Sequence, residues 1–243
     1  MKQLKIYLIG FAAMCVMFSQ AQEKKVAVVT FGVNKYVGVS GNMSPNAATL
    51  ASIAEMANSP KFNLTPVLDN FGNMFFNEYS KTFPFVLIPE DQVTGNPGYK
   101  SYHTIDTNNM YYHNCLMRPG YNLLGVSFAY KQDLMTMIRL FPDADGFMFV
   151  DLSFQFQPKV AYGNIGVCGI NAYASIYIWN KNGDKVLQIW EGANSTGTVP
   201  MLGGIPVIKL DDILPLCQNA ADKLLKDLKG RLPKIIRKCE KKL

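Results

Sequence analysis

Apolar and polar residues alternate along two segments in the middle of the chain. Every second residue is apolar from Gly146 to Phe156 and again from Cys168 to Trp179, where Tyr173 and Tyr177 take the other side. A period of two is typical of a strand that buries one face only. The turn sequence at 180–183 then indicates a hairpin to a third strand.

Shorter apolar runs and helical spacing supply the other predicted elements. Runs rich in β-branched residues predict buried strands over 26–31 and 85–88, and the partner strand of the hairpin covers 185–191. Helical spacing with capping or breaking residues at the ends predicts helices over 44–57, 65–81, 131–140 and 211–232. This order predicts a single α/β domain over 22–232, a sandwich with helices packed on a mixed sheet of about five strands.

The first 21 residues have the layout of a secretory signal peptide. Lys2 and Lys5 precede an apolar run from Ile6 to Phe18, and small residues follow at the positions that a cleavage site needs. The run is shorter than the roughly 20 residues that span a bilayer as a helix. We therefore expect an exported protein, periplasmic or associated with the outer envelope. Lipidation at Cys15 is the weaker alternative, because Met14 stands where an acylation site has a small residue.

Charge is concentrated at the end of the chain. The net charge is +6, and nine basic residues against two acidic ones lie between Lys223 and Leu243. Because the basic residues lie at one end of the chain, this distribution argues against a domain whose main surface binds nucleic acid. The basic tail, 233–243, is either a solvated helix end or a contact for an anionic surface, such as lipid headgroups or an acidic partner. Its basic residues are Lys234, Arg237, Lys238, Lys241 and Lys242.

Four cysteines follow the predicted leader, at 115, 168, 217 and 239. An even number in an exported protein permits disulfides, with three possible pairings. Free, buried thiols are the stronger interpretation, because Cys168 lies in a strand pattern and Cys217 on the apolar face of a predicted helix.

A long segment without periodicity, Gly95 to Asn122, is the strongest candidate for a binding surface. It holds five tyrosines and two histidines, whereas a disordered loop would be poor in aromatic residues. These rings either form a recognition surface or cap the domain's own core. The candidate partner-binding residues are Tyr99, Tyr102, His103, Tyr111, Tyr112, His113 and Tyr121. The outward-facing side chains of Tyr173, Tyr177 and Trp179 either join this surface or lie under a helix.

A second loop, 193–206, contains several glycines. It is predicted to be a plain connector between the last strand and the last helix.

Motifs for catalysis or metal binding are weak. His103, His113 and Cys115 match no known metal-binding spacing, and residues 143–146 fit a turn better than a calcium loop. The serines at 40 and 127 fail the nucleophile pattern of hydrolases. We predict no metal, no cofactor and no catalytic residue, although a carboxylate pair assembled by folding would escape this search.

The order of elements resembles a group of bacterial envelope domains. The group includes the curli-export channel protein CsgG, the amino-terminal domain of TolB and lipoproteins that activate penicillin-binding proteins. The resemblance implies an α/β (α+β) sandwich of the anticodon-binding-domain type and a structural or protein-binding role, and it carries no catalytic residues. The chain lacks the acylation context of the lipoproteins and the two clear lipid-facing hairpins of the channel protein. The matching segments are 25–31, 65–81, 85–90, the turn 143–146 with its strand, 172–191 and 211–232.

The sequence therefore predicts an exported protein-interaction or structural module of the cell envelope, without catalytic activity. Its expected partner is an envelope protein, with peripheral contact to an anionic membrane surface as an addition and no role in nucleic-acid binding. Two alternatives stay open. One is a periplasmic small-ligand binder or hydrolase with a site built from loops, and the other is a component of an oligomeric export channel.

Overall fold

The computed structural model describes residues 23–243, apart from 42, 44, 106, 107, 109–112, 126–128, 163 and 164. At the end of the last helix it describes the helix but not the side chains of 231–236, 238 and 240–242. The predicted leader lies outside the described residues.

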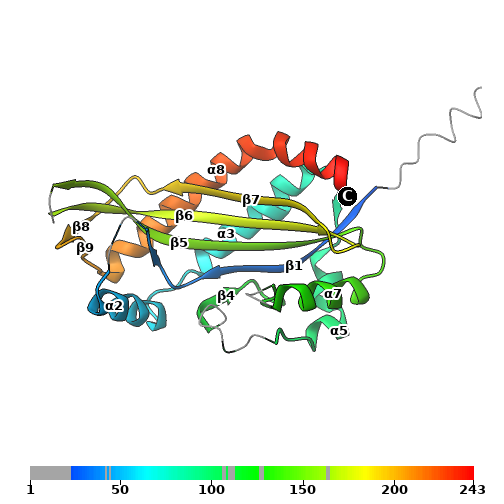
Figure 1. Cartoon of the computed structure of the whole chain (residues 1–243), viewed down its shortest axis with the longest axis horizontal. Helices are drawn as coiled ribbons and strands as arrows, with labels where there is room; N and C mark the ends of the chain where they lie inside the picture. Colours follow the sequence, from blue (N-terminus) through cyan, green and yellow to red (C-terminus); the bar gives the residue numbers. More distant parts are fainter. Residues whose placement is uncertain are drawn as a thin grey trace, which may run out of the picture.

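One mixed sheet organises the molecule, and nine strands belong to it in the described part of the chain. The main order is β3-β1-β5-β6-β8-β9, while β2 pairs with β5, β4 with β1 and β7 with β6. The strands are β1 (Lys25–Asn34), β2 (Gly38–Val39), β3 (Val86–Leu87), β4 (Cys115–Met117), β5 (Gly146–Tyr162), β6 (Ile165–Asn180), β7 (Lys185–Asn194), β8 (Val199–Leu202) and β9 (Ile205–Pro206). Figure 1 views the sheet face-on, with β7, β6, β5 and β1 side by side.

Helices cover the two faces of this sheet unequally. They are α2 (Ala47–Asn58), α3 (Thr65–Met74), α4 (Glu90–Gly95), α5 (Pro97–Lys100), α7 (Tyr130–Leu140) and α8 (Leu210–Lys242). The chain continues from α3 through a π-helical turn, Phe75–Tyr79, and a 3₁₀ turn, Ser80–Thr82. The helices α3 and α8 pack against one face, whereas α4, α5 and α7 cover only one end of the other (Figure 1).

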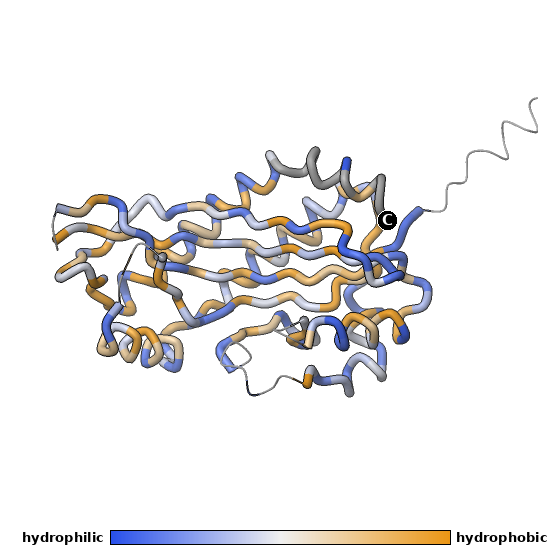
Figure 2. Tube along the Cα trace, in the orientation of Figure 1, coloured by the Kyte–Doolittle hydropathy of each residue, from blue (hydrophilic) through white to orange (hydrophobic). Residues whose placement is uncertain are grey.

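The first of these faces, here called the closed face, carries the larger core. Phe31 of β1 contacts the rings of Phe71 and Phe75 at centroid distances of 5.4 Å, and none of the three rings is more than 1% exposed. The Tyr79 hydroxyl donates a hydrogen bond to the Leu225 carbonyl and so links the π-helical turn after α3 to α8. Figure 2 shows the orange, hydrophobic positions recurring along the central strands. This core holds the helices on the sheet through apolar burial.

The other face, here called the open face, has a smaller core at one end only. Ala27, Val29, Phe147 and Phe149 of β1 and β5 pack there against α7 and its neighbours. Further along β5 the side chains on this face are Asp151, Ser153 and Gln155, all half-buried. The polar half of the alternation seen in the sequence therefore lies on a part of the sheet that the described helices leave open.

The structure confirms an α/β fold but has more strands than the predicted five or so. Two of the additional strands, β8 and β9, lie in the predicted connector 193–206 and form a hairpin around Gly203 and Gly204, whose φ angles are +63° and +77°. The others, β2 and β4, are two and three residues long and have no periodicity that a sequence pattern could show.

The last helix is longer than predicted. We expected it to end near Gly230 and Pro233, but α8 continues to Lys242, so the predicted basic tail is mostly helical. An interior glycine costs about 1 kcal/mol and an interior proline about 3 kcal/mol relative to alanine. Leu228 before these residues and Cys239 after them are both buried, and this packing on either side offsets the cost. In the part of the chain that the structure describes, no helix combines the length and hydropathy needed to cross a bilayer.

Candidate functional site

The tyrosines of the predicted binding loop do not share one role. Tyr99 is completely buried and Tyr121 is 6% exposed, so neither is available to a partner. Their assignment to a partner-binding surface was wrong, and the alternative interpretation, rings that complete the domain's own core, is correct for both. Tyr111 and Tyr112 lie outside the described residues.

Buried polar contacts explain why Tyr99 lies inside. Its hydroxyl donates to the Val29 carbonyl at 3.0 Å and accepts from the Asn122 backbone N–H at 2.8 Å. The Asn122 amide in turn donates to the carbonyls of Tyr99 and Tyr102. Burial raises the pKa of the Tyr99 hydroxyl well above its usual value. The aperiodic segment is therefore attached to β1 by satisfied buried hydrogen bonds.

The remaining predicted loop residues are closer to the surface. Tyr102 is half-buried, and its hydroxyl donates to Asp133 of α7 at 2.8 Å. Burial and the Asp133 carboxylate raise the pKa of Tyr102. His103 and His113 are exposed. In the basic tail Arg237 is exposed, whereas the side chains of Lys234, Lys238, Lys241 and Lys242 lie outside the described residues.

Aromatic residues of the neighbouring strands meet on the open face instead. Tyr173 of β6 and Trp190 of β7 make an edge-on ring contact with centroids 6.1 Å apart, and Trp190 is 67% exposed. A Cβ atom at Gly192, opposite Tyr173, would lie 2.8 Å from its ring, so this glycine leaves room for the ring to lie across β7. Ser175, paired with Trp190, is half-buried beside them. We call Tyr173, Ser175, Gln188 and Trp190 the aromatic patch.

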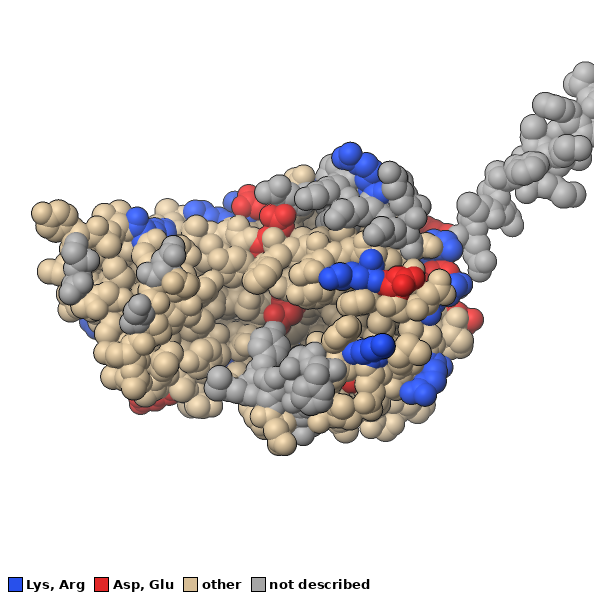
Figure 3. Space-filling model, viewed as in Figure 1, with Lys and Arg blue, Asp and Glu red and all other residues tan. Residues whose placement is uncertain are grey.

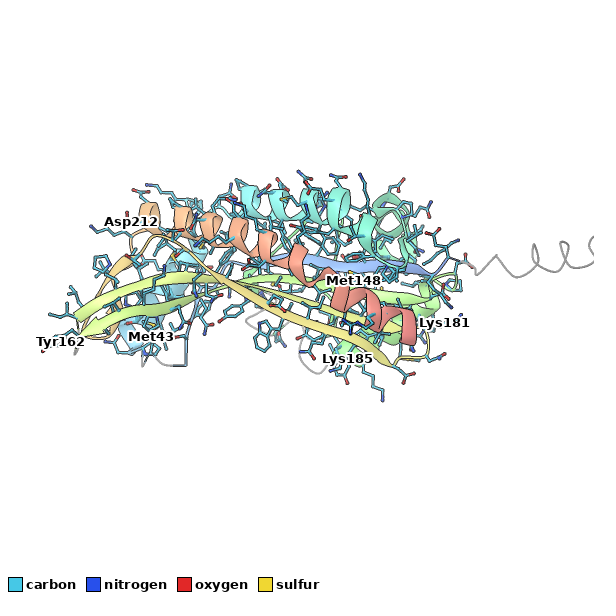
Figure 4. All side chains as sticks on the ribbon, turned by 90° about the horizontal axis from the view of Figure 1, so that it is seen from above. Met43, Met148, Tyr162, Lys181, Lys185 and Asp212 are labelled. Atoms are coloured by element: carbon cyan, nitrogen blue, oxygen red, sulfur yellow. The ribbon has the colours of Figure 1, made fainter. Side chains whose placement is uncertain are left out.

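The aromatic patch lies on a free edge of the sheet. Nine of the ten residues of β7 pair with β6 from Asn171 to Trp179, and no described strand pairs with the other side of β7. Figure 4 looks down on this edge and shows β7 running past α8 with no further strand beside it. An edge strand presents unpaired backbone N–H and C=O groups, and natural proteins usually protect such an edge with proline, lysine or a bulge. Lys185 stands at one end of β7 and the register shifts beside it at Val186, but the strand contains no proline and its remaining length is regular.

A small cleft adjoins the aromatic patch toward α7. It has a volume of about 300 Å³ and is lined by Gly125, Tyr130, Phe149, Tyr177, Trp179 and Lys185. Tyr130 stacks on Trp179 at 5.5 Å, so Trp179 lies under a helix, which was one of its two expected placements. The Lys185 ammonium lies 5.8 Å from the centre of the Trp179 ring. The described lining is aromatic, with one cation and no pair of groups arranged for proton transfer or nucleophilic attack.

A second cleft, of about 600 Å³, lies at the opposite edge of the sheet beside β3. Its lining includes Phe83, Phe85 and Glu90, and the Glu90 carboxylate is bound by the Arg118 guanidinium through two hydrogen bonds of 2.9 and 3.2 Å. In the described residues, no group of three or more His, Cys, Asp and Glu side chains could hold a metal ion.

Two of the cysteines are free thiols inside the closed face. Cys168 and Cys217 are completely buried and form no disulfide. Burial raises the pKa of Cys168 to about 11 and also raises that of Cys217. Burial therefore disfavours the thiolate, which is the reactive form, at both positions.

Comparison with known proteins adds little. No family model and no curated protein matches this chain. One similar solved structure is the hypothetical protein CT253 from Chlamydia trachomatis, with 9% identity and a TM-score of 0.35 over 88% of this chain and 98% of that one. Another is a neuraminyllactose-binding hemagglutinin homolog from Helicobacter pylori, with 8% identity and a TM-score of 0.37 over 90% of this chain and 91% of that one. Similarity this low carries no argument about function, and the resemblance to CsgG, TolB and the lipoprotein activators stays a prediction.

Sequence analysis did not identify Trp190 as a site residue. The sequence does contain a signal for its placement. Gln188 and Trp190 alternate with the buried Leu187 and Ile189, which predicts that they lie on the opposite face of the strand. What the sequence does not show is that the described helices leave this part of the face uncovered.

Proposed function

We propose that the protein is a non-catalytic binding module of the bacterial cell envelope that captures an extended segment of another envelope protein. The segment adds as a strand along the free edge of β7, with its side chains against the aromatic patch. The observation that carries this proposal is a ten-residue edge strand with an exposed tryptophan at its middle. Strand addition gives affinity through backbone hydrogen bonds and specificity through alternate side chains.

The chemistry of the patch supports a polypeptide as the occupant. Trp190 and Tyr173 offer large apolar area together with polar atoms, the combination enriched at the energetic centres of protein interfaces. Ser175 and Gln188 add hydrogen-bonding groups beside the rings. The small-ligand alternative has less support, because the adjoining cleft lacks several converging polar side chains in its described lining.

The experiment is photo-crosslinking in the native envelope with a reactive amino acid at Gln188, an exposed position on the patch. The same reactive residue at Val86, 42% exposed on the opposite edge strand β3, is the matched control. We expect a defined partner at Gln188 only, and Trp190→Ala should reduce its recovery by about tenfold or more.

Three results would count against the proposal. Equal recovery of the same crosslinked protein from Gln188 and Val86 would mean that the partner does not bind specifically to the edge of β7. Recovery unchanged by Trp190→Ala would remove the aromatic patch from the interface. Products joining only two copies of this chain would show that the free edge serves self-association and not capture of a partner.

A further inference from the structure

The β5–β6 hairpin extends beyond the cores of the sheet. Its last pairs, Val160 with Val167 and Tyr162 with Ile165, lie outside both hydrophobic cores. On the far side of β6, β8 pairs with Ile165–Cys168, and β9 completes this end of the sheet. Figure 4 places Tyr162 at one extreme of the molecule, while Lys181 and Lys185 lie near the other.

Large apolar side chains are exposed at this extreme. Val160 is 67% exposed, Tyr162 93%, Ile165 66% and Leu202 57%. They come from β5, β6 and β8, which the register places side by side. We call these four residues the hairpin tip. They are four of the ten large hydrophobic side chains that are exposed among the described residues, and scattered exposure would not gather them on adjacent strand ends.

Charge is absent from the segments that build the hairpin tip. No Asp, Glu, Lys or Arg occurs from Val160 to Asn180 or from Gly192 to Ile208. Behind the tip, the Lys159 ammonium donates to the backbone carbonyls of Ser195 and Thr196, which holds it against the β7–β8 connection. Figure 3 shows the outermost left-hand end without blue or red side chains, whereas charged groups gather at the right-hand end.

A lipid bilayer is the surface that fits this tip. None of the four residues of the tip is charged, so the described part of this surface lacks the polar rim typical of a specific protein contact. Its outermost described ring is a tyrosine, a residue that concentrates at the boundary between headgroups and acyl chains. Because the outer edge of β5 has no described strand partner beyond Phe156, its backbone is unsuited to the hydrocarbon interior and restricts insertion to a shallow depth.

We propose that the hairpin tip inserts into the headgroup region of a lipid bilayer and attaches the protein peripherally to a membrane. Insertion is driven by apolar side chains and not by charge, so it does not depend on anionic lipid and survives high salt. This surface is separate from the aromatic patch, and the two proposals stand or fall independently.

The first test measures binding to vesicles of phosphatidylcholine, with and without phosphatidylglycerol, at low and high salt. The protein is produced from its full-length gene. The tip variant is Tyr162→Ser with Ile165→Ser, and the matched control is Met135→Ser with Val86→Ser, two apolar residues that are exposed elsewhere. We expect binding to pure phosphatidylcholine at both salt concentrations, about tenfold weaker or more in the tip variant and unchanged in the control.

The second test reports which residue meets the lipid. A Tyr162→Trp variant should show a blue-shifted emission with vesicles and strong quenching by brominated lipid, while Met135→Trp on α7 should not. Absence of binding to phosphatidylcholine, or equal quenching in both variants, would overturn the proposal. Binding that needs phosphatidylglycerol and disappears at high salt would assign membrane contact to basic residues. A dimer in buffer that dissociates in the Tyr162→Ser, Ile165→Ser variant would show that a second copy covers the tip.

Discussion

The two faces of the sheet place aromatic residues in opposite situations. On the closed face, Phe71 and Phe75 are at most 1% exposed and pack on Phe31, whereas Trp190 on the open face is 67% exposed and contacts one ring among the described residues, that of Tyr173. Both faces belong to the same alternating strands, so strand pattern alone does not decide what a ring does. The helices decide it, because α3 and α8 cover the closed face and α7 with its neighbours covers only one end of the other. Aromatic residues on the closed face therefore serve stability, whereas those on the part of the open face that the described helices leave uncovered are the ones we propose for binding.

The largest effect is expected from a ring of the closed face. Phe71→Ala should lower the free energy of unfolding by about 3–5 kcal/mol, because it removes the ring from a closely packed cluster and leaves a cavity. Urea unfolding followed by circular dichroism measures this change. Met135→Ala, at an exposed position, is the control and should change the free energy by less than about 0.5 kcal/mol. A loss no greater than the control's would mean that the closed face is not the main core.

An intermediate effect is expected where the open face is covered. Tyr99→Phe keeps the ring but leaves the Val29 carbonyl and the Asn122 N–H without their partner, which should cost about 1–3 kcal/mol. The substitution should also change the response to alkali. Folding raises the pKa of Tyr99, so the unfolded chain loses this proton first, near pH 10, and the native protein becomes less stable as pH rises further.

The measurement is the free energy of unfolding between neutral pH and about pH 11. Above about pH 10, the decline should be shallower in Tyr99→Phe by up to roughly 1.4 kcal/mol per pH unit. Met135→Ala, at an exposed position without a titratable group, should follow the unsubstituted protein. Identical slopes for all three proteins would show that Tyr99 ionises as freely in the folded state as in the unfolded one.

The smallest effect on stability is expected at the aromatic patch. Trp190→Ala removes one exposed ring and its contact with Tyr173, so the free energy of unfolding should change by no more than about 1 kcal/mol. The same substitution should reduce partner recovery by about tenfold, which separates binding from folding. A loss in the free energy of unfolding as large as that of Phe71→Ala would mean that Trp190 belongs to the core. The two faces would then not differ in the role of their aromatic residues.

Alternation predicted the central strands well, since Met148, Val150 and Leu152 are buried as the pattern requires. It failed at the strand ends. Beyond Phe156 the side chains of β5 have no core to face, so apolar and polar residues no longer alternate. The pattern therefore predicts no strand over 157–167. The β8–β9 hairpin was missed for a related reason, because its paired glycines are equally typical of a loop without strands.

The site was harder to predict than the fold. Tyrosine composition singles out the 95–122 segment, but composition cannot tell a ring whose hydroxyl donates inward, as that of Tyr99 does to Val29, from one that faces outward. That distinction depends on contacts between residues far apart in the sequence. Likewise, Gly230 and Pro233 usually end a helix, but α8 continues through them because contacts with residues far away in the sequence stabilise it on either side.

The position of β1 also sets the order in which the chain can fold. This strand comes first after residue 22, yet it pairs in parallel with β5, whose partner residues begin 120 positions later at Gly146. Until that part of the chain has been synthesised, Val26 to Val33 have no β5 to join, and a strand that the finished fold buries at nine of its ten residues lacks this partner. The β5–β6 hairpin, by contrast, can form from neighbours alone. Folding should therefore begin in the second half of the chain and add the first strand late, which leaves the apolar side chains of β1 open to aggregation until β5 is available.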